Sequence, residues 1–295
     1  MAIRPEAVRV FAPAKINLFL HVVGKRGDGY HNLQSLVAFA DAGDVLALER
    51  SREFALVIDG PFAEGLAGEN NNLVLKAAHR LAESIGVREA LRVTLTKNLP
   101  VASGIGGGSA DAAAAMRGAL ALWGRQDANV MDIAAGIGSD VPVCLRSATA
   151  LMEGRGETVT ALPELPPLAI VLANPGISVS TAAVFKRIAI GETRKLEPLA
   201  HAPSSAAELA AYLHATCNDL EPAALSLEPL IGDVLHALRG QGAVLARMSG
   251  SGATCFGLFE TQDQADSAAA RIASQNLRWW VRATKFAAAA VAKPQ

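Results

Sequence analysis

The segment 99–116 carries the densest structural signal in the chain, because four glycines fall within five residues at Gly104 and Gly106–Gly108. A β-branched, alternating stretch at 91–96 predicts a strand before it, and an alanine-rich run from Ser109 predicts a helix after it. Glycine permits positive φ and lets a ligand approach the backbone. Successive N–H groups of such a loop can face one concavity, and the helix adds a positive end. The segment therefore predicts a phosphate-binding loop.

Two common nucleotide-binding loops are excluded by spacing. The segment lacks the Gly-Lys-Ser/Thr ending of a P-loop. It has Ser109 where a dinucleotide fingerprint requires a third glycine, and no acidic residue follows at the expected distance on a second strand. The remaining alternative is a flexible loop without a ligand. Ser109 supplies either a hydroxyl for phosphate or magnesium or a plain helix N-cap.

A second glycine cluster, Ser-Gly-Ser-Gly, lies at 249–252 between two predicted strands. Alone it is compatible with an ordinary turn. Paired with the first cluster, it predicts a second loop that closes over phosphates.

Strand and helix patterns alternate irregularly along the 295 residues, which favours an α+β fold over a doubly wound sheet. The length is typical of one or two domains, and the proline-rich stretch 162–167 is a plausible junction. Asparagines at 70–72 resemble a helix N-cap cluster. We predict strands at 8–11, 16–23, 45–50, 54–58, 91–96, 168–172, 243–248, 255–259 and 279–284, and helices at 73–85, 109–122, 131–137, 181–188, 205–215, 229–238 and 262–274.

Charge and composition exclude several classes of partner. The net charge is −1, so no global field attracts nucleic acid or an anionic membrane. The uncharged stretch 165–185 is interrupted by prolines and polar residues, so it predicts a buried strand and a turn rather than a membrane span. The N-terminus lacks a long apolar segment, and the three cysteines form no CxxC pair. We expect a soluble, cytoplasmic protein.

The two glycine loops, together with the segment Ala12–Leu18, resemble the three motifs of the GHMP small-molecule kinase family. Further motifs at 29–33, 138–142 and 174–178 narrow the resemblance within that family, and it covers about 11–284. The resemblance implies an N-terminal domain of the ribosomal-protein-S5 domain 2-like type at 1–163. It also implies a ferredoxin-like domain at 164–295, with the active site in the cleft between them.

The same resemblance implies a phosphotransferase with an alcohol acceptor, which uses ATP and Mg²⁺ and releases ADP. The implied partner is a small molecule, 4-diphosphocytidyl-2-C-methyl-D-erythritol, phosphorylated on its 2-hydroxyl in non-mevalonate isoprenoid precursor biosynthesis. We expect neither nucleic acid nor a membrane as a partner, and a monomer or weak homodimer.

Lys15 and Asp140 are the candidate catalytic residues. Lys15 is the lone charge in an apolar strand, so it must find an anion or reach water at an edge. Asp140 lies in a tight polar loop, where it is either a general base or an Asx-turn or helix-cap residue. The resemblance implies that Lys15 pairs with Asp140, keeps it ionised and faces the reacting oxygen. Asn17 shares the strand face of Lys15 and orients either the substrate polyol or Lys15 itself.

Aromatic side chains can stack on a nucleobase, and Tyr30, His31 and Phe185 are the candidates. Core packing for Phe185 and a structural role for His31 are the alternatives. The resemblance places the cytidine substrate on these three residues and on Asn17, Asp140, Thr181, Gly250, Ser251 and Gly252. It places ATP on Asn72, Leu73, Val74, Lys97, Pro100, Val101, Ala102, Ser103, Gly104, Ile105, Gly106, Gly107, Gly108, Ser109 and Ala110.

Several points of the ATP site stay open. Lys97 and Asn98 are equally compatible with a solvated turn. Some relatives carry more glycine before the loop and Ser-Asn after it, so Ala102, Ser103 and Asp111 are departures that affect loop flexibility or metal affinity. No second carboxylate for magnesium is evident, which leaves Ser109, the ATP phosphates and water as its candidate ligands.

Other functions compete with this one. A GHMP kinase for homoserine or mevalonate would have no base to stack on Tyr30 and Phe185. A nucleotide-binding sensor without catalysis would not need both Lys15 and Asp140. A nucleic-acid-binding module is disfavoured because the chain lacks a basic stripe with interspersed aromatic residues.

Overall fold

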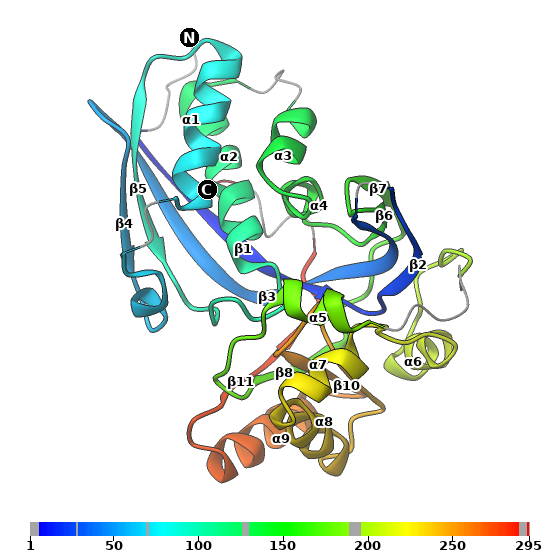
Figure 1. The fold of residues 1–295 in the computed structure, drawn as a ribbon. Coiled ribbons are helices and arrows are strands. Elements are labelled where there is room, and N and C mark those ends of the chain that lie inside the picture. Colours follow the sequence, from blue (N-terminus) through cyan, green and yellow to red (C-terminus); the bar gives the residue numbers. More distant parts are fainter. Residues whose placement is uncertain are drawn as a thin grey trace.

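A computed structural model describes residues 6–27, 29–68, 71–125, 130–188, 196–288 and 294. These residues form two β-sheets, each covered by helices on its outer face (Figure 1). Strands and helices are mixed without βαβ repetition, so the predicted α+β class is confirmed.

The first sheet has seven strands in the order β4-β5-β3-β6-β7, and β1 and β2 also pair with β3. Its strands are β1 (Ala7–Asn17), β2 (His21–Lys25), β3 (His31–Ser51), β4 (Ala55–Asp59), β5 (Ala90–Thr96), β6 (Ala150–Gly154) and β7 (Thr158–Ala161). A short 3-10 helix lies at Ala63–Leu66, and the covering helices are α1 (Leu73–Ile85), α2 (Gly107–Trp123), α3 (Met131–Ile137) and α4 (Val141–Arg146).

The second sheet has four strands in the order β11-β8-β10-β9, all antiparallel. Taken in chain order, the strands run 4-1-3-2 across the sheet, which is the ferredoxin-like arrangement that we predict. The strands are β8 (Ala169–Asn174), β9 (Leu245–Met248), β10 (Cys255–Phe259) and β11 (Trp280–Lys285). The helices of this half are α5 (Thr181–Arg187), α6 (Ala206–His214), α7 (Glu221–Leu227), α8 (Leu230–Gly240) and α9 (Gln262–Gln275).

β8 shows how the two halves share a core, because all six of its residues are buried. Val171 and Ala173 face the cluster beneath α8 and α9, whereas Ile170 and Leu172 face the first sheet and α6. On that second side they join residues of β1 and β3 such as Ile16 and Leu36. The two sheets therefore pack on each other, and this contact fixes the cleft between them. The boundary at 163/164 stays a prediction.

Most predicted elements are present, with three kinds of correction. The predicted strand 16–23 is broken, because β1 ends at Asn17 and β2 begins at His21. The strand predicted at 45–50 is the end of β3, which has 21 residues. Five short elements were not predicted, because four to seven residues carry little periodicity: the 3-10 helix at Ala63–Leu66, α4, β6, β7 and α7.

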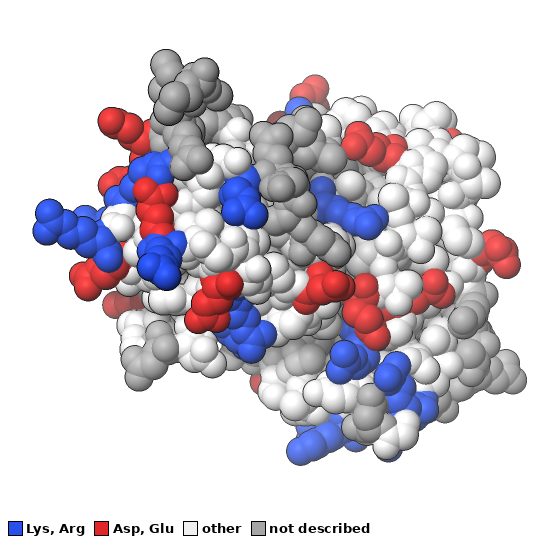
Figure 2. All heavy atoms as spheres, turned by 90° about the horizontal axis from the view of Figure 1, so that it is seen from above, with Lys and Arg blue, Asp and Glu red and all other residues white. Residues whose placement is uncertain are grey.

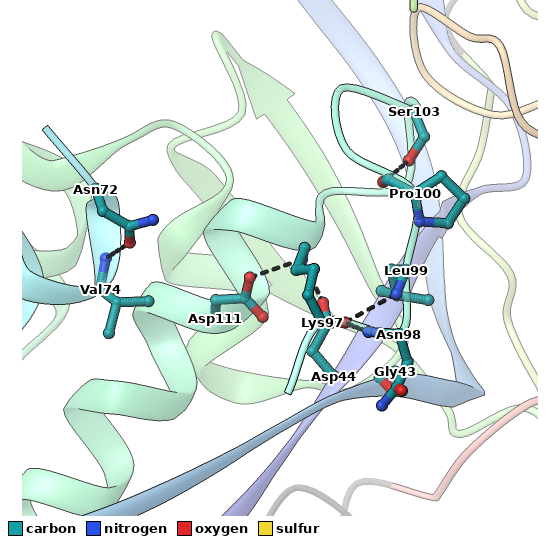
Figure 3. A network of polar contacts seen from close by, with 10 residues as sticks. All are labelled: Gly43, Asp44, Asn72, Val74, Lys97, Asn98, Leu99, Pro100, Ser103 and Asp111. Carbon is teal, nitrogen blue, oxygen red and sulfur yellow. Dashed lines mark hydrogen bonds and ion pairs between the residues drawn. The ribbon is translucent and has the colours of Figure 1, made fainter. Parts of the chain in front are cut away.

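Local sequence explains the ends of α1. Asn72 is the N-cap, and its Oδ1 accepts a hydrogen bond of 2.9 Å from the Val74 N–H (Figure 3). Asn70, also in the predicted cap cluster, lies outside the described residues. Gly86 ends the helix with φ +69°, the left-handed conformation that glycine adopts most easily.

Candidate active site

A cleft of about 1430 Å³ lies between the two halves, and both glycine loops line it. The predicted site residues on its wall are Lys15, Asn17, Tyr30, His31, Asn72, Leu73, Lys97, Pro100, Val101, Ala102, Ser103, Gly104, Gly106, Gly107, Gly108, Ser109, Asp140, Thr181, Phe185, Gly250 and Ser251. Gly252 is not among the lining residues, and the side chains of Val74, Ile105 and Ala110 lie in the hydrophobic cores.

Lys15 and Asp140 form an ion pair in this cleft. Lys15 Nζ lies 2.9 Å from Asp140 Oδ2, and the lysine is only 4% exposed. A buried ammonium requires such a partner, so the edge-strand alternative for Lys15 is wrong. Asp140 occupies the N-cap position of α4, but its side chain makes no cap hydrogen bond. The helix-cap alternative is therefore wrong for the Asp140 side chain.

The first glycine loop turns around the lysine. The N-cap of α2 is Gly106 with φ +63°, and a Cβ on this residue would lie 3.1 Å from Lys15 Cε. The Lys15 N–H also donates to the Ile105 carbonyl at 2.9 Å. Helix α2 thus begins at Gly107, two residues before the predicted start, and Ser109 is not its N-cap. The first turn of α2 opens onto the cleft beside Lys15.

The second glycine loop packs against the first, backbone on backbone. A Cβ added to Gly250 would lie 2.7 Å from the Gly104 carbonyl oxygen. A Cβ added to Gly104 would lie 2.5 Å from the Ser249 carbonyl oxygen. The Ser249 hydroxyl donates to the Gly104 carbonyl at 3.0 Å, and the Thr254 N–H donates to the Ser103 carbonyl at 3.0 Å. The second loop is therefore a support for the first as well as part of the cleft wall.

Lys97 is held below the first loop by the carboxyl groups of Asp44 and Asp111 (Figure 3). Its Nζ lies 2.8 Å from Asp111 Oδ2 and also contacts Asp44, and the side chain is 2% exposed. The solvated-turn alternative for Lys97 is therefore wrong. Asp44 also accepts the N–H groups of Asn98 and Leu99 at 2.6 and 2.9 Å, so it anchors the start of the loop.

Burial controls the titration of this cluster. Burial by itself would lower the pKa of Lys97, but attraction to Asp111 and Asp44 outweighs it, so the pKa is raised. Burial also raises the pKa of Asp111 to about 8, although Lys97 opposes this shift. Asp111 Oδ1 is buried and has no hydrogen-bond partner within the described part of the chain. Two carboxyl groups and one ammonium thus share a site with little water.

Sequence reasoning missed Asp44 and Ser35, although both contribute polar atoms next to the cleft. Asp44 is a fully buried acid within the long apolar strand β3, so the argument that identified Lys15 would have identified it as well. Ser35 lines the cleft and contacts Asn17, but a single serine in an apolar stretch gives no comparable signal.

The three aromatic candidates also line the cleft. The rings of His31 and Phe185 are stacked, with centroids 5.2 Å apart and planes inclined by 27°. Tyr30 is 59% exposed, and the Arg155 guanidinium lies over its ring at 5.3 Å. Phe185 packs partly against the core of the second half, so it contacts both core and cleft. Thr181 Oγ1 lies 2.8 Å from Ser251 Oγ.

Figure 2 shows one face of the molecule, on which basic and acidic side chains are interspersed. Within the described residues, none of the helices has the length and apolar character needed to cross a membrane. Those residues also contain no cluster of three or more His, Cys, Asp or Glu that could hold a metal ion.

Comparisons with known proteins identify the family. The model of the GHMP kinases N-terminal domain matches 72–148, and that of the GHMP kinases C-terminal domain matches 196–277. The 4-diphosphocytidyl-2-C-methyl-D-erythritol kinase of Parvibaculum lavamentivorans is 52% identical, over 92% of this chain and 95% of that protein. The one from Paracoccus denitrificans is 53% identical, over 95% of this chain and 97% of that protein.

Comparison with solved structures identifies the same family. A crystal structure of 4-(cytidine 5'-diphospho)-2C-methyl-D-erythritol kinase superposes with a TM-score of 0.76 at 32% identity, over 95% of this chain and 100% of that one. Homoserine kinase from Cytophaga hutchinsonii has a TM-score of 0.74 at 20% identity, over 100% and 98%, and shows the shared fold alone. The chain therefore belongs to the GHMP kinases and, within them, to the family of the 4-diphosphocytidyl-2-C-methyl-D-erythritol kinases.

Proposed function

We propose that this protein transfers the γ-phosphoryl group of ATP to the 2-hydroxyl of 4-diphosphocytidyl-2-C-methyl-D-erythritol. The observation that carries the proposal is the buried Lys15–Asp140 ion pair, at 2.9 Å, beside the glycine loop in a cleft of about 1430 Å³. The substrate in this proposal is inferred from the names of the relatives. The residues of the cleft are of the types that phosphoryl transfer to an alcohol requires.

Phosphoryl transfer to an alcohol requires that the hydroxyl lose its proton and that negative charge be stabilised at the reacting oxygens. Asp140 is the proton acceptor in our proposal, because its carboxylate is partly exposed to the cleft while Lys15 holds one of its oxygens. The ammonium of Lys15 stabilises the developing charge without reorganisation, because its position is fixed by burial.

The ATP phosphates would bind the N–H groups of the first glycine loop and the N-terminal end of α2. Adenosine would lie toward Asn72 and Leu73, which line the same cleft. Lys97 supports the loop from below, because both of its carboxylate partners are internal. We therefore propose that Lys97 affects ATP binding indirectly, by holding the first glycine loop in place.

Magnesium fits the site only as an ion held largely by phosphates and water. Asp111 is committed to Lys97, and no carboxylate cluster faces the cleft within the described residues. Ser109, in the first turn of α2, would supply a hydroxyl to the ion. When bound, Mg²⁺ would neutralise phosphate charge.

The cytidine end of the substrate would occupy the wall formed by Tyr30, His31 and Phe185, with Thr181 and Ser251 beside it. A Phe185→Ala variant should raise the KM for the cytidyl substrate, because the cytosine ring loses a stacking partner. The KM for ATP should stay unchanged, because ATP does not contact Phe185 in our proposal. An unchanged KM for the cytidyl substrate would assign Phe185 to the core alone.

A coupled ADP-release assay with ATP, Mg²⁺ and the cytidyl substrate tests the function, with the phosphorylated product identified by mass. Homoserine and mevalonate serve as competing acceptors and should give no turnover. Asp140→Asn should lower kcat by roughly 10²–10⁴-fold while ATP binding survives. Absence of wild-type turnover would refute the proposal, whereas a fast Asp140→Asn enzyme would refute only the base. The cytoplasmic location and the monomer or weak homodimer stay predictions.

A further inference from the structure

A chain of polar contacts runs from the ion pair into the protein. Lys15 Nζ donates to Asn17 Oδ1 at 3.1 Å, Asn17 Nδ2 donates to Ser35 Oγ at 2.8 Å, and Ser35 Oγ donates to the Phe19 carbonyl at 2.5 Å. We propose that Ser35 is a positioning residue for the kinase reaction, whose hydroxyl orients the Asn17 amide so that its oxygen faces Lys15. This inference rests on the function proposed above.

The number of donors and acceptors determines the direction of this chain. A serine hydroxyl has one hydrogen, and the Phe19 carbonyl can only accept, so the Ser35 proton points to Phe19. The Ser35 oxygen must then accept from Asn17, which turns Nδ2 toward Ser35 and Oδ1 toward Lys15. The reversed amide would place two acceptors together at Ser35 and two donors together at Lys15.

Because the side chains of this chain of contacts are buried, the orientation of the Asn17 amide determines whether Lys15 has a hydrogen-bond acceptor. Lys15, Asn17 and Ser35 are 4%, 3% and 3% exposed, so water does not compete for these groups. Lys15 can approach Asn17 only as a donor to an acceptor. Both polar ends of the Asn17 side chain are engaged, and its role in our proposal is to hold Lys15.

The backbone of Asn17 is held independently. Its N–H donates to Ser249 Oγ at 3.0 Å, β1 pairs with β3 up to Asn17, and the Leu18 N–H then donates to the Leu36 carbonyl at 2.8 Å. Removal of the Ser35 hydroxyl should therefore free the amide to rotate without displacing the strand. The effect on the reaction would pass through Asn17 alone.

A double-mutant cycle on the full chain tests this route. Ser35→Ala should lower kcat roughly tenfold, the equivalent of one charged-group hydrogen bond, with the KM for ATP unchanged. Asn17→Ala and the double variant should be equally slow, because Ser35 has no effect once the amide is gone. Additive losses in the double variant would overturn the proposal.

Two further variants control for folding and packing. Ser35→Thr keeps the hydroxyl on a β-strand and should retain kcat within about threefold of wild type. A Ser35→Thr enzyme as slow as Ser35→Ala counts against the proposal. Thr284→Val removes a buried hydroxyl from β11 in the other sheet and should leave both kinetic constants unchanged.

A measurement without substrate separates this inference from the proposed function. The side-chain NH₂ signal of Asn17, assigned by its loss in Asn17→Ala, should exchange slowly with solvent in the free wild-type protein. In Ser35→Ala, exchange should be at least tenfold faster. Equal exchange in the two proteins would overturn the role of Ser35, even if the wild type phosphorylates the cytidyl substrate. A wild type without turnover would refute the function and leave this result standing.

Discussion

The contact between the two glycine loops leads to a quantitative prediction for Gly104→Ala. Gly104 has φ +79°, and an added Cβ would lie 2.5 Å from the Ser249 oxygen and 2.8 Å from both N and O of Gly252. All three neighbours are backbone atoms, so no side chain can rotate away. The left-handed conformation costs a non-glycine residue about 1–2 kcal/mol, and overpacking a close contact adds about 1–3 kcal/mol. We expect a loss of roughly 2–5 kcal/mol in the free energy of unfolding.

Two other glycines separate these contributions. Gly86 has φ +69°, but no heavy atom lies within 4 Å of its added Cβ, so Gly86→Ala should cost only the conformational part, about 1–2 kcal/mol. Gly108 lies in the first turn of α2, with Leu73 Cδ1 at an ordinary 3.7 Å. Gly108→Ala should therefore stabilise the protein by about 0.5–1 kcal/mol.

Urea unfolding of the three variants, followed by circular dichroism, gives the comparison. The packing contribution is the difference between Gly104→Ala and Gly86→Ala. If Gly104→Ala were no less stable than Gly86→Ala, the two loops would not be in close contact, and the support for the phosphate-binding loop would have to come from elsewhere.

Further predictions concern buried groups. Burial raises the pKa of folded Asp111 to about 8, whereas the unfolded chain titrates near the ordinary pKa of 3.8. Stability contributed by this residue is thus lost as pH rises between those values, so in urea unfolding the stability of Asp111→Asn relative to wild type should increase from pH 5 to pH 8. A constant difference would contradict the shift. Ala102 has φ +51°, so Ala102→Gly should stabilise the protein by about 1 kcal/mol, measured as a higher Tm. Thr284 Oγ1 is buried with no hydrogen-bond partner in the described part of the chain, so Thr284→Val should also raise the Tm. Arg247 donates four hydrogen bonds from a buried guanidinium, and Arg247→Met should cost about 3 kcal/mol or more in urea unfolding.

Much of the architecture was predictable because the signals are local. The strand–loop–helix context of Gly104–Gly108 depends on residues that are neighbours in the chain, and glycine adopts the positive φ found at Gly104 and Gly106 most easily. Periodicity likewise located α1, α9 and β8 within one or two residues. Short elements such as α4 were missed, although α4 carries Asp140 at its N-cap.

The roles of individual polar residues were harder to predict. Lys15 and Asp140 were identified because a lone charge in an apolar strand and an acid in a polar loop are unusual. For Lys97 the sequence left an ATP contact or a solvated turn, and the structure contradicts only the solvated turn, because the side chain is buried between the carboxyl groups of Asp44 and Asp111. Its partner Asp44 is 53 residues away in the chain, and no periodicity links such positions.

The sequence alone thus determined which residue types carry the chemistry and which local elements hold them, because periodicity, capping and glycine φ angles act over a few residues. Only the tertiary structure decided how they meet. The pairing of β1 with β3 brings Lys15 and Asn17 to Phe39 and Val37, and so places Ser35 beside the Asn17 amide. The packing of one glycine loop on the other joins residues 145 positions apart. Such contacts depend on strand register and on close packing between sheets, which no short stretch of sequence contains.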